Sequence, residues 1–401
     1  MRIATQQMHE RAVSLMLERQ SQLASVQQQL ATGKRQVSAS EDPTAAALSM
    51  RLTREIATLE RYQANTDLAY GQQAAQEDAL AGVTELLHGV RERIVQGKNG
   101  SLSDADRQAL AIDLDQRLEG LLGLANTRYG DEYLFAGLKS GTRPFSHDGR
   151  GQFTYDGDSG QRMLDIGPEV RTAVNDPGVE VFQGIRAGNG AFVTAADADN
   201  DGRGSISVGN AVGGFVADDY VIALSRGAPA GPMTYTVRNG ADEVVAEGEY
   251  QSGSPIRFNG AEVAISGAPA DGDRFSIAPA GRQDIFSILH GAARALESAG
   301  EGPGASAQRE TALDRSLAEL DTALNHVLAK RAGVGARLSQ IEDQREANAA
   351  FQLTAEETLS DTQDLDYAEA AMRLQTQLVG LEAAQRSYMM IQDLSLFRLI
   401  R

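Results

Sequence analysis

The chain has 401 residues, enough for two to three domains at the usual ~150 residues each. Lys and Arg total 37 against 55 Asp and Glu, and the resulting net charge of −18 has the wrong sign for a protein that binds nucleic acid or an anionic membrane. The sequence contains no cysteine, which excludes disulfides, thiol catalysis and Cys-ligated metals.

Charged residues interrupt the first 30 positions, so we expect no cleavable signal peptide. No segment approaches the roughly 18 apolar residues that a membrane span needs. A secreted chain of this kind would have to leave the cell by a route without a cleaved signal.

An apolar heptad opens the chain. Met16, Leu23, Leu30 and Val37 recur every seven residues, which is typical of a coiled coil. The segment therefore predicts a helix with a partner.

A second, much longer helix is predicted from about residue 43 to 96. Asp42 and Pro43 are favoured at the N-cap and first helical position, and a Gly-Lys-Asn-Gly run ends the helix at 97–100. At ~1.5 Å per residue it would be about 80 Å long. A compact globule of this chain length is only about 55 Å across, so we expect an elongated rod.

Two further segments predict helices that pack beside it. Ser103 and Asp106 have the spacing of a capping box, and the leucines that follow predict a helix ending near Asn126. Apolar residues continue in steps of three and four from Leu313 to Ile341, with Arg331 as a charged interruption expected at the edge of the seam.

The middle of the chain has a different composition. Residues 141–281 hold 24 of the 41 glycines and 8 of the 10 prolines, which predicts a turn-rich insert in a helical frame. Short strands separated by turn residues are expected at 153–155, 220–224, 234–237 and 262–265. The insert is predicted to be a small antiparallel sandwich or barrel.

The last forty residues carry two apolar stripes. One contains Leu374, Leu378, Leu381, Tyr388 and Leu399, and the other contains Met372, Val379, Met389 and Leu396. One partner helix cannot cover both stripes. We therefore expect other copies of the chain to cover the remainder.

Two local patterns have weak chemical interpretations. Asp197, Asp199 and Asp201 match the first half of an EF-hand loop, but Val208 stands where the bidentate Glu is needed. Calcium binding is therefore a weak prediction, and an acidic turn exposed to solvent is the favoured interpretation. Gly157-Asp158-Ser159-Gly160 is similar to the nucleophile segment of serine proteases, yet the five histidines are scattered. No cofactor and no enzymatic activity are expected.

Several short stretches at both ends of the chain and in the predicted rod form a recognisable set. They are Met1-Arg2-Ile3-Ala4-Thr5, Ala31-Thr32-Gly33-Lys34-Arg35, Ser40-Glu41-Asp42-Pro43, residues 97–104, Tyr133-Leu134-Phe135-Ala136-Gly137-Leu138-Lys139 with Pro144-Phe145, and Ser395-Leu396-Phe397-Arg398-Leu399. Together they resemble the bacterial flagellar axial proteins, and among them the hook-associated protein 3 family. The terminal helices are shared with flagellin, whereas the Tyr-Leu-Phe-Ala-Gly segment and the Ser-Leu-Phe ending are more similar to the junction family. The likeness covers the helical frame and is weaker in the insert.

The resemblance implies a secreted structural subunit that joins the hook to the filament. It implies type III export, a homo-oligomeric ring, and contacts with hook-associated protein 1, flagellin and a flagellar export chaperone. A flagellin is the alternative, and a secreted hydrolase or calcium-dependent adhesin is a remote one.

The expected fold is mainly α with an inserted β domain, as an elongated flagellin-like rod. Its expected parts are the paired terminal helices (1–40 with 361–401), a helical rod (41–140 with 283–360) and an outer β domain (141–282). The expected assembly interface comprises Ile3, Met16, Leu23, Leu30, Val37, Leu374, Leu378, Leu381, Tyr388, Leu396 and Leu399.

Overall fold

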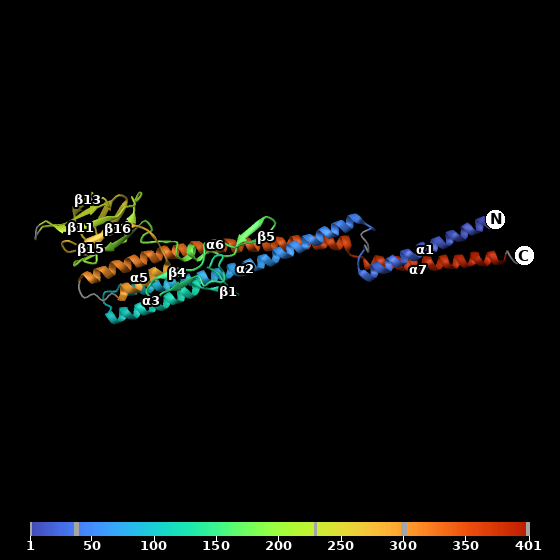
Figure 1. Cartoon of the computed structure of the whole chain (residues 1–401), viewed down its shortest axis with the longest axis horizontal. Coiled ribbons are helices and arrows are strands. Elements are labelled where there is room, and N and C mark those ends of the chain that lie inside the picture. Colours follow the sequence, from blue (N-terminus) through green and yellow to red (C-terminus); the bar gives the residue numbers. More distant parts are fainter. Residues whose placement is uncertain (1, 36–39, 228–230, 298–302, 398–401) are drawn as a thin grey trace. The chain divides into compact units, whose positions relative to one another are not determined.

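A computed structural model describes residues 2–35, 40–227, 231–297 and 303–397, and it describes the side chains of these residues apart from 2–6, 8–9, 303 and 391–397 (Figure 1). The chain divides into two compact units, one formed by residues 1–65 with 344–401 and the other by residues 66–343. The helices are α1 (Arg2–Thr32), α2 (Pro43–Gly97), α3 (Asp104–Ala125), α4 (Gly178–Phe182), α5 (Ile285–Glu297), α6 (Pro303–Gln363) and α7 (Tyr367–Phe397).

Short antiparallel strands fill the region between α3 and α5. Those before α4 are β1 (Arg128–Tyr129), β2 (Glu132–Tyr133), β3 (Phe145–His147), β4 (Phe153–Tyr155), β5 (Met163–Gly167) and β6 (Val170–Ala173). Those after it are β7 (Ile185–Arg186), β8 (Phe192–Ala196), β9 (Arg203–Ile206), β10 (Asn210–Ala211), β11 (Tyr220–Arg226), β12 (Met233–Arg238), β13 (Val244–Glu249), β14 (Pro255–Phe258), β15 (Ala261–Ala268), β16 (Arg274–Pro279) and β17 (Arg282–Gln283). The expectation of a mainly α fold with an inserted β domain is confirmed.

The predicted helix starts are confirmed by their caps. The Asp42 carboxylate accepts hydrogen bonds from the backbone N–H groups of Thr44 and Ala45, both at 3.0 Å, and so satisfies donors that an α-helix leaves unpaired at its start. Ser103 and Asp106 form a reciprocal capping box at the start of α3. Because these signals are local, the sequence alone places both helix starts.

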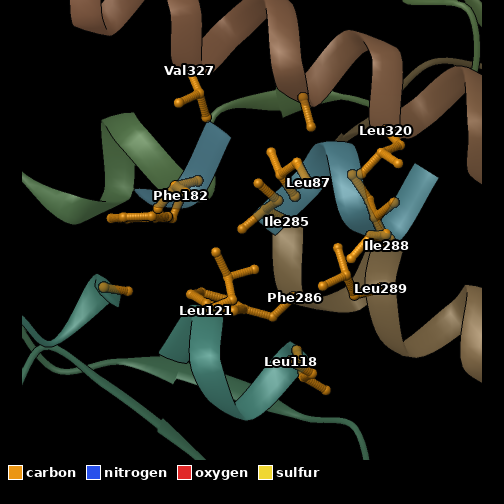
Figure 2. Close-up of a cluster of buried hydrophobic side chains, with 14 of the residues drawn as sticks. Leu87, Leu118, Leu121, Phe182, Ile285, Phe286, Ile288, Leu289, Leu320 and Val327 are labelled. Carbon is orange, nitrogen blue, oxygen red and sulfur yellow. The ribbon is translucent and has the colours of Figure 1, made fainter. Parts of the chain in front are cut away.

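One hydrophobic core joins the helices of the 66–343 unit. Side chains from α2, α3, α5 and α6 meet there, and Figure 2 shows residues of α5, among them Phe286, beside leucines of α2, α3 and α6. Its ring lies 5.4 Å from that of Phe153 and 5.9 Å from that of Phe182, so aromatic packing closes the centre. The sequence predicts three packed helices from the apolar runs it resolves, and α5 adds a fourth.

The glycine-rich insert contains two parts that pack differently. Phe145 of β3 and Phe182 of α4 belong to the helical core, together with the half-buried Phe153 of β4. Residues 192–277 form a separate core of their own. The composition of residues 141–281 is uniform, but a few buried aromatic side chains attach its first third to the helices.

The second part of the insert is an antiparallel β-sandwich. One sheet has the order β13-β12-β11-β16-β8, and the other has the order β10-β15-β14 with β9 also paired to β15. Tyr220, Ile222 and Phe275 of the first sheet share a buried core with Val263 and Ile265 of the second. Along β11 buried and exposed residues alternate at first, as a strand with one covered face requires.

Polar side chains also connect the helices to the hairpins. Buried Asp176 accepts hydrogen bonds from Gln76 of α2 at 2.8 Å and Gln161 at 3.0 Å, and it forms an ion pair with Arg337 of α6. Arg331, expected at an edge of the seam, keeps 30% of its side chain exposed and pairs with Glu77 of α2. Both pairs link residues that are far apart in sequence.

Candidate assembly interface

The first and last helices of the chain pack against each other (Figure 1). On α1, Val26 is buried and Met16, Leu23 and Leu30 are half-buried. On α7, the half-buried positions are Leu374, Leu381 and Tyr388, while Leu378 stays 46% exposed. The two heptads are thus brought together, although most of their side chains remain partly open to solvent.

Four predicted interface positions cannot be placed with the others. Val37 and Leu399 lie outside the described residues, and the side chains of Ile3 and Leu396 lie outside the described side chains. Their role in an interface stays a prediction.

The second stripe of α7 is uncovered within the described residues. Met372 is 64% exposed, Val379 62% and Met389 57%. On α1, Leu15 and Leu17 are also exposed, by 49% and 62%. Exposed apolar side chains repeated along a helix face favour binding to protein, because leaving them in water is unfavourable.

A short antiparallel contact lies where α1 ends and α7 begins. The Arg35 N–H donates to the carbonyl of Gln363 at 2.8 Å, and the Leu365 N–H donates to the carbonyl of Gly33 at 3.0 Å. Gly33 has φ +70°, and a Cβ there would lie 2.8 Å from the Tyr367 hydroxyl, so only glycine fits without strain. The contact joins the end of α1 to the start of α7 and fixes how the two helices are aligned along their length.

Charged residues of α7 are paired along the helix itself. Arg373 pairs with Glu369, and Arg386 pairs with Glu382, at the i,i+4 spacing. Such exposed pairs stabilise a helix weakly and keep its polar face solvated. The carboxylates of α7 are therefore consistent with a solvated face and call for no acid–base chemistry.

Hydrogen bonds within the EF-hand-like turn and to neighbouring segments hold it in place. The Asp197 carboxylate accepts from the Asp199 N–H at 3.2 Å, and the Asp201 N–H donates to Asp273 at 3.2 Å. Gln308 of α6 donates to the carbonyl of Ala198 at 3.0 Å. In the part of the chain that the structure describes, no three His, Asp or Glu side chains are grouped so that they could hold a metal ion.

The protease-like segment forms a turn. The Asp158 carboxylate accepts from the N–H groups of Leu138 and Gly160, at 2.9 and 2.8 Å, and these bonds hold the pKa of that carboxyl below its usual value. Ser159 is exposed, and the nearest histidine in sequence, His147, pairs with Glu119 of α3 at 3.1 Å. The Asp158 carboxylate therefore closes a turn, and His147 is engaged elsewhere.

Comparisons with known proteins agree with this arrangement. Residues 3–140 match the family model described as the bacterial flagellin N-terminal helical region. The flagellar hook-associated protein 3 of Escherichia coli K12 is 25% identical to the chain and is matched over 100% of this chain and 99% of that protein. None of the described helices is long and apolar enough to cross a membrane.

Solved structures give the same picture. The crystal structure of the flagellar junction protein FlgL from Legionella pneumophila matches with a TM-score of 0.72 at 34% identity, covering 79% of this chain and 100% of that one. Phase 1 flagellin from Salmonella naestved is 33% identical, but only over 27% of this chain and 21% of the flagellin. Likeness to the junction proteins thus extends over most of the chain, and likeness to flagellin is confined to a part of it.

Proposed function

The chain belongs to the flagellar hook-associated protein 3 family and is a structural subunit of the hook–filament junction; from this we propose that it assembles through the exposed faces of α1 and α7. The observation that carries the proposal is the uncovered stripe formed by Met372, Val379 and Met389. A lone molecule leaves these side chains in water, whereas neighbouring copies and other axial proteins can bury them.

The proposed partners follow from a position between two polymers. The subunit contacts hook-associated protein 1 on the hook side and flagellin on the filament side, and its own copies complete a ring. It reaches this place by type III export. Before export, a flagellar chaperone covers the apolar face of α7, because an exposed stripe of this kind favours aggregation.

Replacement of the three stripe residues by serine tests the proposal. Cells that lack the native chain receive either the full chain or the variant Met372→Ser, Val379→Ser, Met389→Ser. We expect the variant to leave filaments unattached and cells unable to swim, and to do so also when it is added to the cells as purified protein, so that a lost chaperone contact does not account for the effect. Normal swimming with this variant would overturn the proposed interface.

A matched control uses three exposed valines of the other unit. Val95, Val212 and Val244 are 50%, 55% and 48% exposed, so their replacement by serine likewise puts three polar side chains at exposed apolar positions. We expect this control to swim normally. Equal loss of swimming in both variants would show that serine at any exposed apolar position abolishes swimming, and would contradict a specific role of the α7 stripe.

The flagellin alternative predicts a different product. A filament subunit polymerises alone into long filaments, whereas a junction subunit adds only a short zone. Electron microscopy of the purified chain after concentration distinguishes the two, and long filaments of this chain alone would contradict the junction role.

A further inference from the structure

A second pair of unpartnered helix faces lies in the 1–65 with 344–401 unit. There α2 buries Leu52 and Leu59, 6% and 5% exposed, and α6 buries Asn348 and Ala355, 1% and 6% exposed. Each helix thus has one covered line, spaced by seven residues. The opposite side of each helix faces solvent.

The solvent side of α2 carries what we call the basic stripe. Its residues follow steps of four and three along the helix and are all exposed: Met50, Arg54, Ala57, Arg61 and Ala64. At about 100° per residue they lie on the side opposite Leu59. Met50 is 60% exposed, and neither arginine forms an ion pair with a described residue.

The solvent side of α6 carries what we call the acidic stripe. Its exposed residues are Glu346, Ala349, Leu353, Glu357 and Ser360. Leu353 is 57% exposed, and Glu346 and Glu357 form no ion pair among the residues described. The two stripes share a row of small and apolar side chains but carry opposite charge.

The charges of the two stripes also match in position. The helices run antiparallel, since Arg331 of α6 pairs with Glu77 of α2 and Arg337 hydrogen-bonds Gln73. Suppose that Leu52 of α2 lies at the level of Ala355 of α6, and Leu59 at the level of Asn348. Arg61 is then level with Glu346, and Arg54 lies one helical turn from Glu357.

One chain cannot bring its own stripes together, because each stripe points away from the covered line of its own helix. We propose that the basic stripe of one copy docks on the acidic stripe of the next copy, which lies beside it in the same orientation. Unlike patches that meet head to tail generate a ring or a helical array. The inference rests on the proposed function and names a lateral contact for the ring, separate from α1 and α7.

Cysteine cross-linking tests the contact directly, because the native chain has no cysteine. Cells that lack the native chain produce the full chain with Ala57→Cys and Ala349→Cys, and a short bismaleimide is added to their isolated flagella. We expect a ladder of dimers, trimers and higher species. Each single-cysteine variant should give none, since each cysteine then faces an alanine of the neighbour.

The outcomes separate the two proposals. Swimming without any cross-link would overturn the lateral contact and leave the junction assembly through α1 and α7 intact. Cross-links that stop at dimers would mean a two-fold contact and would also overturn it. Filaments that stay attached in cells without the chain would instead overturn the proposed function itself.

Charge exchange tests the chemistry of the contact. In the double-cysteine chain, Arg54→Glu with Arg61→Glu, or Glu346→Arg with Glu357→Arg, should lower the cross-linked fraction by about tenfold, because like charges then oppose each other. The chain with all four changes, and a mixture of the two double variants, should recover it. If reversal has no effect or the exchange restores nothing, the stripes do not pair.

A matched control keeps the net charge of the first reversal. Arg143 and Arg150 are exposed residues of the other unit, outside both stripes. Arg143→Glu with Arg150→Glu should leave the ladder unchanged. Loss of the ladder in this control would attribute the effect to total charge and would contradict the stripe contact.

Discussion

The helical core of the 66–343 unit and the terminal pair α1 and α7 both carry apolar residues at helical spacing, but they bury these residues to different extents. Around Phe286 most of the aromatic and aliphatic side chains are buried, while Met372, Val379 and Met389 remain more than half exposed. The core is completed by segments of one chain, including hairpins and a fourth helix. The terminal pair has one partner helix for two apolar stripes, so the second stripe stays open in the monomer, and the proposed assembly would cover it.

The largest expected effect is in the closed core. Phe286→Ala removes a ring packed against Phe145, Phe153 and Phe182, and we expect a loss of about 3–5 kcal/mol in the free energy of unfolding. Urea denaturation of the purified monomer measures it. A loss below about 1 kcal/mol would mean that this core is as open as the terminal pair.

A smaller loss is expected in the buried polar contacts beside that core. Asp176→Asn keeps the shape but leaves the Arg337 cation unpaired, and we expect a cost of about 2–3 kcal/mol. Adding Arg337→Met should recover part of it. If Asp176→Asn has no effect, the ion pair contributes nothing and only apolar packing distinguishes the two regions.

Tyr155 allows a pH test of the closed region. Its hydroxyl lies 3.0 Å from the Phe135 carbonyl and 2.7 Å from that of Asp158, and burial raises its pKa to about 12. The folded state favours the neutral hydroxyl. The stabilisation that this hydroxyl gives to the folded state is therefore present below the unfolded pKa of about 10 and is lost as pH rises towards 12.

Tyr155→Phe should therefore lower the free energy of unfolding by about 1 kcal/mol at neutral pH. The difference in stability between the variant and the native chain should become smaller in alkali. Melting temperatures of both proteins, measured at pH 8 and at about pH 11, give the comparison. A gap that is constant or widens with pH would contradict burial of the hydroxyl.

The smallest effect on the monomer is expected at the open stripe. Val379→Ser should change the free energy of unfolding by less than about 0.5 kcal/mol, because the side chain is already 62% exposed. Urea denaturation of dilute protein measures it. A large loss would mean that the stripe is buried within the monomer and is not reserved for assembly.

Local signals made much of the frame predictable. Asp42 with Pro43 and Ser103 with Asp106 mark helix starts because a cap depends on neighbouring residues. All four segments expected as strands lie within observed strands, since turn residues bound them. The exposed second stripe of α7 was also predictable, because counting partner helices requires only the heptads.

Contacts between distant segments were not predictable from one sequence. Nothing near Arg331 indicates Glu77 as its partner, and nothing near Asp176 indicates Arg337. The division of the insert depends on which core Phe145 and Phe182 enter, and glycine content does not encode that choice. The basic and acidic stripes likewise become visible only when the covered lines of α2 and α6 are known.

The contact of Gly33 and Arg35 with Gln363 and Leu365 sets the phase of the terminal helices. α1 ends just before it and α7 starts just after it, so both are counted from one fixed point. A slip of one residue would turn α7 by about 100° and replace Leu374 in the seam by a polar neighbour. Because the starting point is fixed, every molecule presents the same apolar stripe at the same angle, which the proposed addition of identical subunits in succession requires.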